Sequence, residues 1–182
     1  MVHYMGKNFL IVIDMQNDFI KGVLGSKDAV RAANNLVRFL KENASSYDAI
    51  YATHDKHNRK DYGNTEEERR IPRHCLDDST GHLLDSRIHK YISESNIFEK
   101  DTFCSIWMLI ELTWNYPNRL DDITFDIVGL CTDICVISNA LMLRSYFPNA
   151  KIRVFADCCA GTTSEKHEAA LEVMRSCLID II

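Results

Sequence analysis

Short runs of hydrophobic residues alternate along the chain with longer segments in which hydrophobic residues recur at helical spacing. The short runs expected to form strands are 8–13, 49–53, 96–99, 123–130, 151–156 and 178–182, and helical spacing occurs in 28–41, 104–114, 134–146 and 164–177. Strands that are apolar almost throughout and alternate with helices are typical of a parallel sheet covered by helices on both faces. We therefore predict a three-layer α/β/α fold, with residues 1–182 forming one domain.

The segment 56–80 breaks this alternation. It is polar and shows no clear period. At about 25 residues it is too long for a simple connection, and long loops in compact domains are usually functional. Its densest charged run, 66–70, carries both signs and is expected to form a solvated loop or helix surface.

Composition excludes several classes of function. The 182 residues suffice for a hydrophobic core, and 21 Lys and Arg against 26 Asp and Glu give a net charge of −5. The scattered, net acidic charge argues against a nucleic-acid partner, which needs a basic face. No run approaches the roughly 20 apolar residues that span a bilayer, and the N-terminus lacks a secretory cleavage site. No membrane partner is therefore expected. Seven irregularly spaced cysteines fit a reduced, cytoplasmic protein.

Polar residues end four of the predicted strands. Asp14, Asp55 and Lys100 each follow or close a hydrophobic run, and the segment 131–135 follows a fourth. In open parallel sheets, ligands bind outside the carboxyl ends of the strands. We therefore expect these side chains to share one site.

Cys135 is the candidate nucleophile of that site. It falls where the strand 123–130 gives way to a helix, and the unpaired N–H groups of a first helical turn favour a thiolate and an oxyanion. The alternative is a small buried core residue, the usual fate of a free cysteine. Thr132 and Asp133 could each either cap the helix or act directly in the site.

Asp14 and Lys100 are candidate partners of this thiol. A carboxylate at the end of a buried strand is costly unless it is paired or functional, and a cation nearby would stabilise both the carboxylate and a thiolate. Taken singly, Asp14 could be a turn former and Lys100 a solvated strand end. Their predicted position beside Cys135 favours an activated nucleophile.

Five motifs resemble those of the isochorismatase-like cysteine hydrolases, and most of all the nicotinamidases. They are DMQNDF (14–19), THDKH (53–57), PRHC (72–75), EKDTF (99–103) and VGLCTDICV (128–136), in the order of that family. The resemblance covers about residues 8–165. It implies a catalytic triad of Asp14, Lys100 and Cys135, and an oxyanion hole of backbone N–H groups at Cys131 and Cys135. It also implies a cis peptide before Cys131.

The resemblance further implies a divalent metal ion, zinc before manganese or iron, that holds a pyridine nitrogen. Its ligands would be Asp55, His57 and His74, with Glu67 as a fourth and Glu66 or Glu68 as alternatives. An Asp-x-His pattern with a distant His does supply three N/O ligands and an open coordination position. His54 is expected to have a structural role.

The implied substrate pocket contains Phe19 and Phe103, each of which could instead be a core aromatic. Ile71 departs from the pattern, because nicotinamidases often carry an aromatic residue three positions before the second metal histidine. This departure leaves the preference for a pyridine ring open.

The function predicted from these residues is a metal-dependent cysteine amidohydrolase that converts nicotinamide to nicotinic acid and ammonia, in pyridine nucleotide salvage. Alternatives are hydrolysis of another small amide or a ureido or carbamoyl compound, isochorismatase activity, and a non-catalytic binding protein of the same fold. The partner is then a small-molecule amide. Since members of this family tend to self-associate, a homo-oligomer is also expected.

Overall fold

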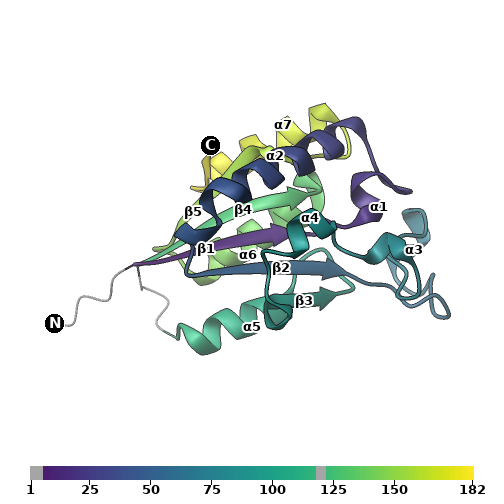
Figure 1. Ribbon diagram of the computed structural model, residues 1–182, viewed down its shortest axis with the longest axis horizontal. Coiled ribbons are helices and arrows are strands. Elements are labelled where there is room, and N and C mark those ends of the chain that lie inside the picture. The colour runs from purple at the N-terminus through teal and green to yellow at the C-terminus, as the bar shows by residue number, and fades with distance from the viewer. Residues whose placement is uncertain (1–5, 118–121) are drawn as a thin grey trace.

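The computed structural model describes residues 6–117 and 122–182, which form a parallel sheet of six strands (Figure 1). The strands are β1 (Lys7–Ile13), β2 (Ala49–Asp55), β3 (Ile97–Lys100), β4 (Ile123–Leu130), β5 (Lys151–Ala160) and β6 (Asp180–Ile181). Every predicted strand is present. β5 runs four residues beyond the predicted 151–156, because its last residues pair with Gly129 and Leu130 of β4 after a register shift.

Helices cover both faces of the sheet, which confirms the predicted α/β architecture (Figure 1). They are α1 (Asn17–Ile20), α2 (Lys27–Asn43), α3 (Glu66–Arg70), α4 (Ser86–His89), α5 (Ile106–Asn115), α6 (Ile137–Tyr146) and α7 (Ser164–Ser176). Residues of α5, α6 and α7 pack on one face, and those of α2 and α4 on the other. Within the described ranges, no helix has the length and hydrophobicity needed to cross a membrane.

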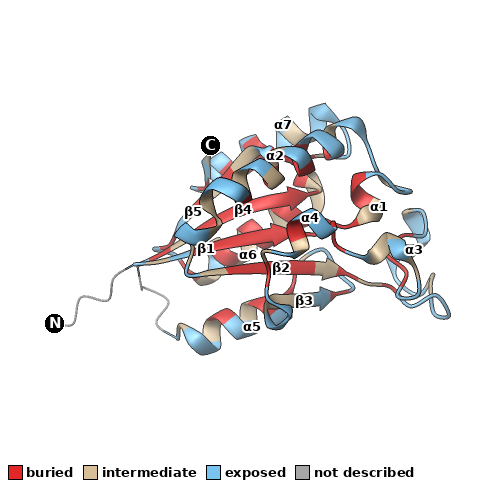
Figure 2. Cartoon of the chain, viewed as in Figure 1, coloured by how far each residue is buried: buried red, intermediate tan, exposed pale blue. Residues whose placement is uncertain are grey.

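The hydrophobic core lies on both sides of the sheet (Figure 2). Alternate residues of a strand point to opposite faces, so the two sides of β1 belong to different clusters: Phe9 and Ile11 pack with α5 and α6, whereas Leu10 and Val12 pack with α2. Burial on both sides explains why this strand is an unbroken hydrophobic run.

The strand order is β3-β2-β1-β4-β5-β6, so the direction of winding reverses between β1 and β4. This switch point is where ligands bind in open α/β sheets, beyond the carboxyl ends of the strands. Gly129 makes the close approach of these two strands possible. It has φ +134°, and a Cβ atom there would collide with the backbone of Ile13.

The polar segment 56–80 contains one short helix, α3, at the run Glu66–Arg70. Thr65 caps this helix, since its hydroxyl accepts a hydrogen bond from the N–H of Glu68 while the Glu68 carboxylate accepts one from the N–H of Thr65. The expected solvated surface is only one side of α3. Glu67 and Glu68 are turned toward the carboxyl ends of the strands, where the polar site lies.

Candidate active site

Asp14 follows β1 and is fully buried with a backbone φ of +44°, a conformation that side chains other than glycine rarely adopt. Thr53 of β2 holds it in two ways. The Thr53 hydroxyl donates to Asp14 Oδ1 at 2.6 Å and accepts the Asp14 N–H at 3.2 Å. Burial raises the pKa of Asp14, while Lys100 and the Thr53 hydroxyl act to lower it.

Lys100 ends β3 and is buried among three functional groups. Its Nζ lies 2.8 Å from Asp14 Oδ2, 3.0 Å from Asp55 Oδ1 and 3.7 Å from Cys135 Sγ. Burial alone would lower the pKa of Lys100, but the nearby Asp14, Cys135 and Asp55 outweigh it and hold that pKa well above its ordinary value. Lys100 is therefore a cation at neutral pH, fixed between two carboxylates and a thiol.

Cys135 lies in a single π-helical turn, Thr132–Val136, that joins β4 to α6. The first turn after the strand is thus wider than the α-helical turn predicted there, and the N–H groups of Ile134 and Val136 both donate to the carbonyl of Cys131. The Leu130–Cys131 peptide is cis, as the resemblance implies. Burial raises the pKa of the Cys135 thiol although Lys100 lowers it, so ionisation requires a proton acceptor close by.

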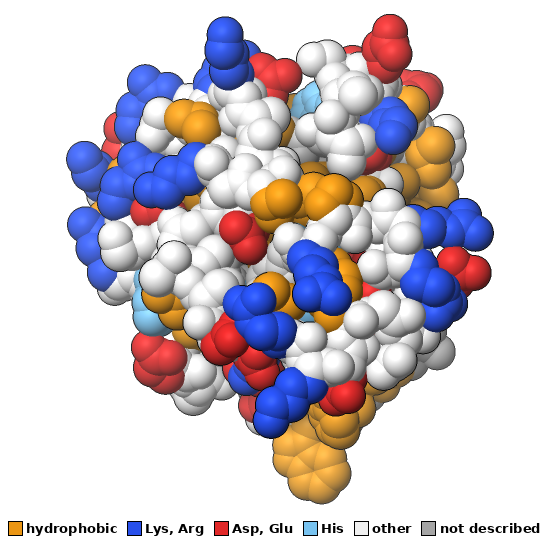
Figure 3. All heavy atoms as spheres, turned by 90° about the vertical axis from the view of Figure 1, so that its right-hand side faces the viewer, with side chains coloured by type: hydrophobic (Ala, Val, Ile, Leu, Met, Phe, Trp, Pro, Cys, Tyr) orange, Lys and Arg blue, Asp and Glu red, His pale blue; other side chains and the backbone are white. Residues whose placement is uncertain are grey.

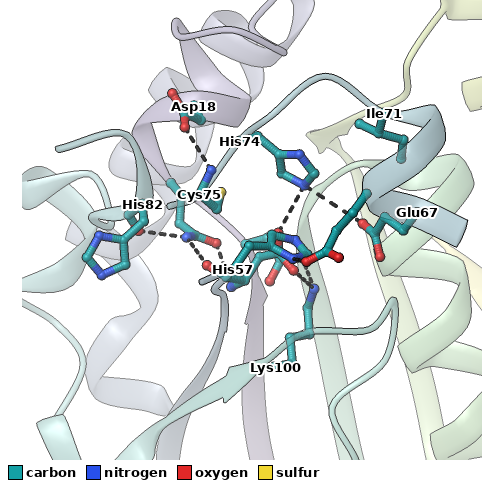
Figure 4. Close-up of polar contacts among 12 residues, drawn as sticks. Asp18, His57, Glu67, Ile71, His74, Cys75, His82 and Lys100 are labelled. Carbon is teal, nitrogen blue, oxygen red and sulfur yellow. Dashed lines mark hydrogen bonds and ion pairs between the residues drawn. The ribbon is translucent and has the colours of Figure 1, made fainter. Parts of the chain in front are cut away.

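Four side chains form a cluster suited to a metal ion. The ligand atoms of Asp55, His57, Glu67 and His74 all lie within 4.8 Å of one another (Figure 4). Asp55 Oδ2 is 3.0 Å from His57 Nε2 and 3.2 Å from His74 Nε2, and Glu67 Oε1 is 3.8 Å from His74 Nε2. Tetrahedral ligands about 2 Å from a zinc ion lie roughly 3.3 Å apart. Two imidazole nitrogens and two carboxylate oxygens at this spacing fit zinc or a similar divalent ion.

The histidine rings of this cluster are oriented by acceptors on their outer side. Glu68 Oε1 lies 3.2 Å from His57 Nδ1, and the Pro72 carbonyl lies 2.8 Å from His74 Nδ1. If each Nδ1–H donates to these oxygens, the Nε2 lone pairs face the centre of the cluster, as a metal requires. Glu67, not Glu66 or Glu68, is therefore the glutamate placed for ligation. The Glu66 side chain is 69% exposed and pairs with Arg70.

Gln16 is a part of the site that the strand-end pattern did not single out. Its Nε2 donates to the carbonyls of Asp55, at 2.7 Å, and His82, at 2.6 Å, and its Oε1 accepts the N–H of Asp55 at 2.8 Å. His54 also contacts the His82 carbonyl, at 2.6 Å, and stacks on the His82 ring. It is not in the metal cluster. Both side chains fix the backbone that carries Asp55, which is the structural role expected of His54.

Thr132 and Asp133 contact α7 and the segment that precedes it. Asp133 accepts hydrogen bonds from the N–H and the hydroxyl of Thr162, at 2.8 and 2.6 Å, and does not cap the turn Thr132–Val136, in which it is the second residue. The Thr132 hydroxyl is 2.8 Å from His167 Nδ1. Helix capping, one of the two interpretations of Asp133 from the sequence, is thus wrong. Asp133 instead anchors one wall of the cavity described next.

A cavity of about 350 Å³ opens between Cys135 and the metal cluster. Its lining residues are Phe19, Leu24, Glu67, Ile71, His74, Cys131, Ile134, Cys135, Thr162 and Lys166. Figure 3 looks onto this end of the sheet and shows hydrophobic side chains gathered in the middle of the face. Phe19 packs edge-on against the His74 ring, with 5.4 Å between ring centroids. Phe103 is 41% exposed and is not among the lining residues.

Comparison with known proteins places the chain among related sequences and folds. The model of the isochorismatase domain family matches residues 8–182. A nicotinamidase/pyrazinamidase of Mycobacterium tuberculosis is 28% identical, over 95% of this chain and 97% of that protein. The structure of a pyrazinamidase/nicotinamidase from Streptococcus mutans superposes with a TM-score of 0.80 at 23% identity, covering 97% and 100% of the two chains. A pyrazinamidase of Pyrococcus horikoshii in complex with zinc has a TM-score of 0.77 at 23% identity, covering 97% and 98%.

Proposed function

The chain belongs to the isochorismatase domain family, a family of hydrolases, and on that premise we propose that it is a metal-dependent nicotinamidase with Cys135 as nucleophile. The reaction is nicotinamide plus water to nicotinic acid plus ammonia. The curated relative named nicotinamidase/pyrazinamidase supports the substrate class, and the zinc complex of a structural relative supports the metal. The seven free thiols fit the reducing cytoplasm, where this activity would serve pyridine nucleotide salvage.

One observation carries the proposal. The cavity is lined by Cys135, by Glu67 and His74 of the metal cluster, and by Phe19 and Ile71. A planar ring bound at the cluster through a ring nitrogen would therefore present its carboxamide to the thiol. A volume of about 350 Å³ lies at the small end of the range for ligand pockets, as a one-ring substrate requires.

In the first half of the reaction, the Cys135 proton passes to the Asp14 carboxylate as Sγ attacks the amide carbon. Lys100 stabilises the thiolate that forms, because its ammonium is 3.7 Å from Sγ. Backbone N–H groups at Cys131 and Cys135 are proposed to bind the oxyanion. The C–N bond then breaks, Asp14 returns the proton to the leaving nitrogen, and ammonia departs from a thioester.

In the second half, water attacks the thioester carbon and gives a proton to Asp14. The C–S bond breaks, the sulfur regains that proton, and nicotinic acid is released. Asp14 thus serves as general base and general acid in turn, which suits a carboxyl group whose pKa is raised by burial.

Asp55, His57, Glu67 and His74 would hold the metal ion, which when bound supplies a Lewis-acid contact for the pyridine nitrogen. Phe19 would pack on the ring. Ile71 takes the position at which nicotinamidases often carry an aromatic residue. This side of the pocket is therefore aliphatic and cannot stack on the substrate ring.

The test is an ammonia-release assay on a substrate panel. Nicotinamide, pyrazinamide, benzamide and a ureido compound are compared with the purified enzyme, before and after chelation and after zinc is restored. We expect ammonia release from nicotinamide and pyrazinamide, and slower release from benzamide, which lacks the ring nitrogen. Chelation of the metal should abolish ammonia release. Equal rates on benzamide, or no effect of chelation, would contradict the metal's role. Binding of nicotinamide without turnover would instead identify a non-catalytic binding protein.

A further inference from the structure

α5 exposes hydrophobic side chains that the rest of the described chain (6–117 and 122–182) leaves uncovered. Seven of its ten residues are hydrophobic, yet only Met108 and Leu112 are buried. Five exposed residues at the start of and along the helix form what we call the α5 stripe: Phe103, Ile106, Trp107, Ile110 and Trp114. The stripe lies at the far edge of the sheet, beside β3, and Figure 3 shows hydrophobic side chains protruding at its lower margin, where α5 lies. A helix that is hydrophobic all round is normally covered on all sides.

The stripe is large for an exposed surface. Trp114 is 84% exposed and Trp107 67%, and with the other three members the apolar area is about 500 Å² if an aromatic side chain offers about 150–250 Å². Single surface hydrophobics need no explanation, but a patch of about 500 Å² is near the top of the range for the largest patch on a monomer, and such patches are often functional. Two such patches packed together would bury about 1,000 Å², the lower bound for a specific protein–protein interface.

Three residues of the stripe are spaced almost symmetrically along the helix. Trp107 and Trp114 are seven residues apart, which places them on the same side of the helix about 10 Å apart, with Ile110 close to their midpoint. Two α5 helices packed antiparallel about a two-fold axis at Ile110 would therefore set Trp107 of each copy against Trp114 of the other. A closed two-fold interface requires this kind of self-complementary surface.

A groove beside the stripe completes the complementarity. It has a volume of about 460 Å³ and is lined by Ile106, Trp107 and polar residues that include Lys56, Glu99, Lys100 and Asp101. Since it adjoins Trp107, the antiparallel arrangement brings the protruding Trp114 of the second copy to its mouth. A tryptophan seated in a pocket at the centre of an interface is a typical source of binding energy.

We propose that the α5 stripe is the interface of a two-fold homodimer of this chain. A lipid surface is a poorer partner. The acidic residues next to the stripe, Glu99, Asp101 and Glu111, outnumber the two lysines of the groove, whereas membrane-surface helices are rich in lysine and arginine. The stripe itself shares no lining residue with the active-site cavity, although the groove beside it reaches Lys100.

Sedimentation velocity and tryptophan fluorescence test the proposal together. The chain's only two tryptophans are Trp107 and Trp114, so its tryptophan emission reports on the stripe alone. Full-length protein should sediment as a dimer at micromolar concentration, and its emission should shift to longer wavelength as dilution dissociates it. A monomer at all concentrations, with emission typical of solvent-exposed tryptophan throughout, would overturn the proposal.

Ile110→Arg places like charges together at the two-fold axis and should give a monomer with an unchanged circular dichroism spectrum. Val173→Arg on α7 is the matched control, because Val173 is 48% exposed and Ile110 47%, and this variant should remain dimeric. Mixing Ile110→Arg with Ile110→Glu should restore a dimer, which only a symmetric contact near residue 110 explains. A dimer that survives Ile110→Arg would place the interface elsewhere.

Discussion

Asp55 and Lys100 connect the metal cluster to the predicted triad. Asp55 Oδ1 lies 3.0 Å from Lys100 Nζ, while Asp55 Oδ2 lies 3.0 Å from His57 Nε2 and 3.2 Å from His74 Nε2. One carboxylate thus contacts both halves of the site. Although burial raises the pKa of Asp55, its hydrogen bonds to His57 and His74 and the charge of Lys100 hold that pKa far below the ordinary value. A permanent anion here fixes where the lysine cation sits.

Lys100→Met should destabilise the protein as well as inactivate it. Removing the cation leaves two buried carboxylates, Asp14 and Asp55, without their shared partner, and breaking a buried ion pair costs about 3–5 kcal/mol. Urea unfolding followed by circular dichroism measures the loss. Lys56→Met is the control, since its 2.8 Å pair with Glu99 is partly exposed and should cost about 0.5 kcal/mol or less. Equal losses in the two variants would contradict the central position of Lys100.

Cys135→Ala should lower kcat/KM for the amide by about 10⁴-fold or more, because the covalent route is removed. Cys131→Ser is the control within the same cavity. Burial raises the pKa of Cys131 to about 12, so it is not a thiolate at neutral pH, and its backbone N–H is kept in the variant. Mass spectrometry of rapidly quenched enzyme should show the acyl group in wild type and in Cys131→Ser. Acylation of Cys135→Ala would refute the assignment.

The three consecutive glutamates of α3 should differ in their effect on metal content. Glu67→Gln removes a proposed ligand and should weaken zinc binding the most. Glu68→Gln removes the acceptor on His57 Nδ1, and loss of such an orienting partner typically costs about 10–100-fold in affinity. Glu66→Gln should have no effect, because that side chain is exposed. Zinc titration against a competing chelator measures all three. A ranking with Glu66 first would exclude the cluster as the binding site.

Thr53→Val should shift the acid limb of the kcat/KM profile to higher pH. In the proposed mechanism Asp14 must be a carboxylate to accept the thiol proton, and the Thr53 hydroxyl stabilises that carboxylate through a 2.6 Å hydrogen bond. Burial already raises the Asp14 pKa, and losing the hydrogen bond raises it further, so activity is lost sooner as the pH falls. Thr53→Ser, which keeps the hydroxyl, should retain the wild-type limb. An unchanged profile in Thr53→Val would indicate that another group controls it.

Phe19→Ala should raise KM for nicotinamide about 10-fold or more, because Phe19 lines the cavity and packs on His74. Phe103→Ala should leave KM unchanged at enzyme concentrations where the oligomeric state is the same, since Phe103 faces solvent. Steady-state kinetics on both variants distinguishes the two aromatic residues. The reverse result would mean that Phe103 closes over the substrate.

Much of the site was predictable because strand ends are visible in the sequence. Asp14 and Lys100 each close a hydrophobic run, and the parallel sheet brings such ends together. Gln16 was missed because its hydrogen bonds go to backbone groups of Asp55 and His82, which no side-chain pattern reveals. The role of Asp133 depends on Thr162, 29 residues further on. Contacts between segments far apart in the chain depend on the folded structure and produce no local pattern in the sequence.

The surface of α5 was also beyond sequence reasoning. A mostly apolar helix next to a predicted sheet was expected to cover that sheet, but only Met108 and Leu112 are fully buried against it, with Leu109 partly buried. The cause is its position over β3, an edge strand of four residues with little area to cover. The structure therefore explains why the helix has more hydrophobic surface than its own domain can bury.

The division of the site between strand ends and the segment 56–80 has a consequence for how this enzyme can change. The groups proposed for bond cleavage, Asp14, Lys100 and Cys135, stand on or beside the sheet, whereas His57, Glu67, Ile71 and His74 all come from or next to that one segment. Substitutions, insertions or an exchange confined to a single stretch of chain can thus give the protein a different substrate while the bond-breaking groups stay in place. Selectivity can therefore change largely through this one segment, while Asp55 remains the group that both halves of the site share.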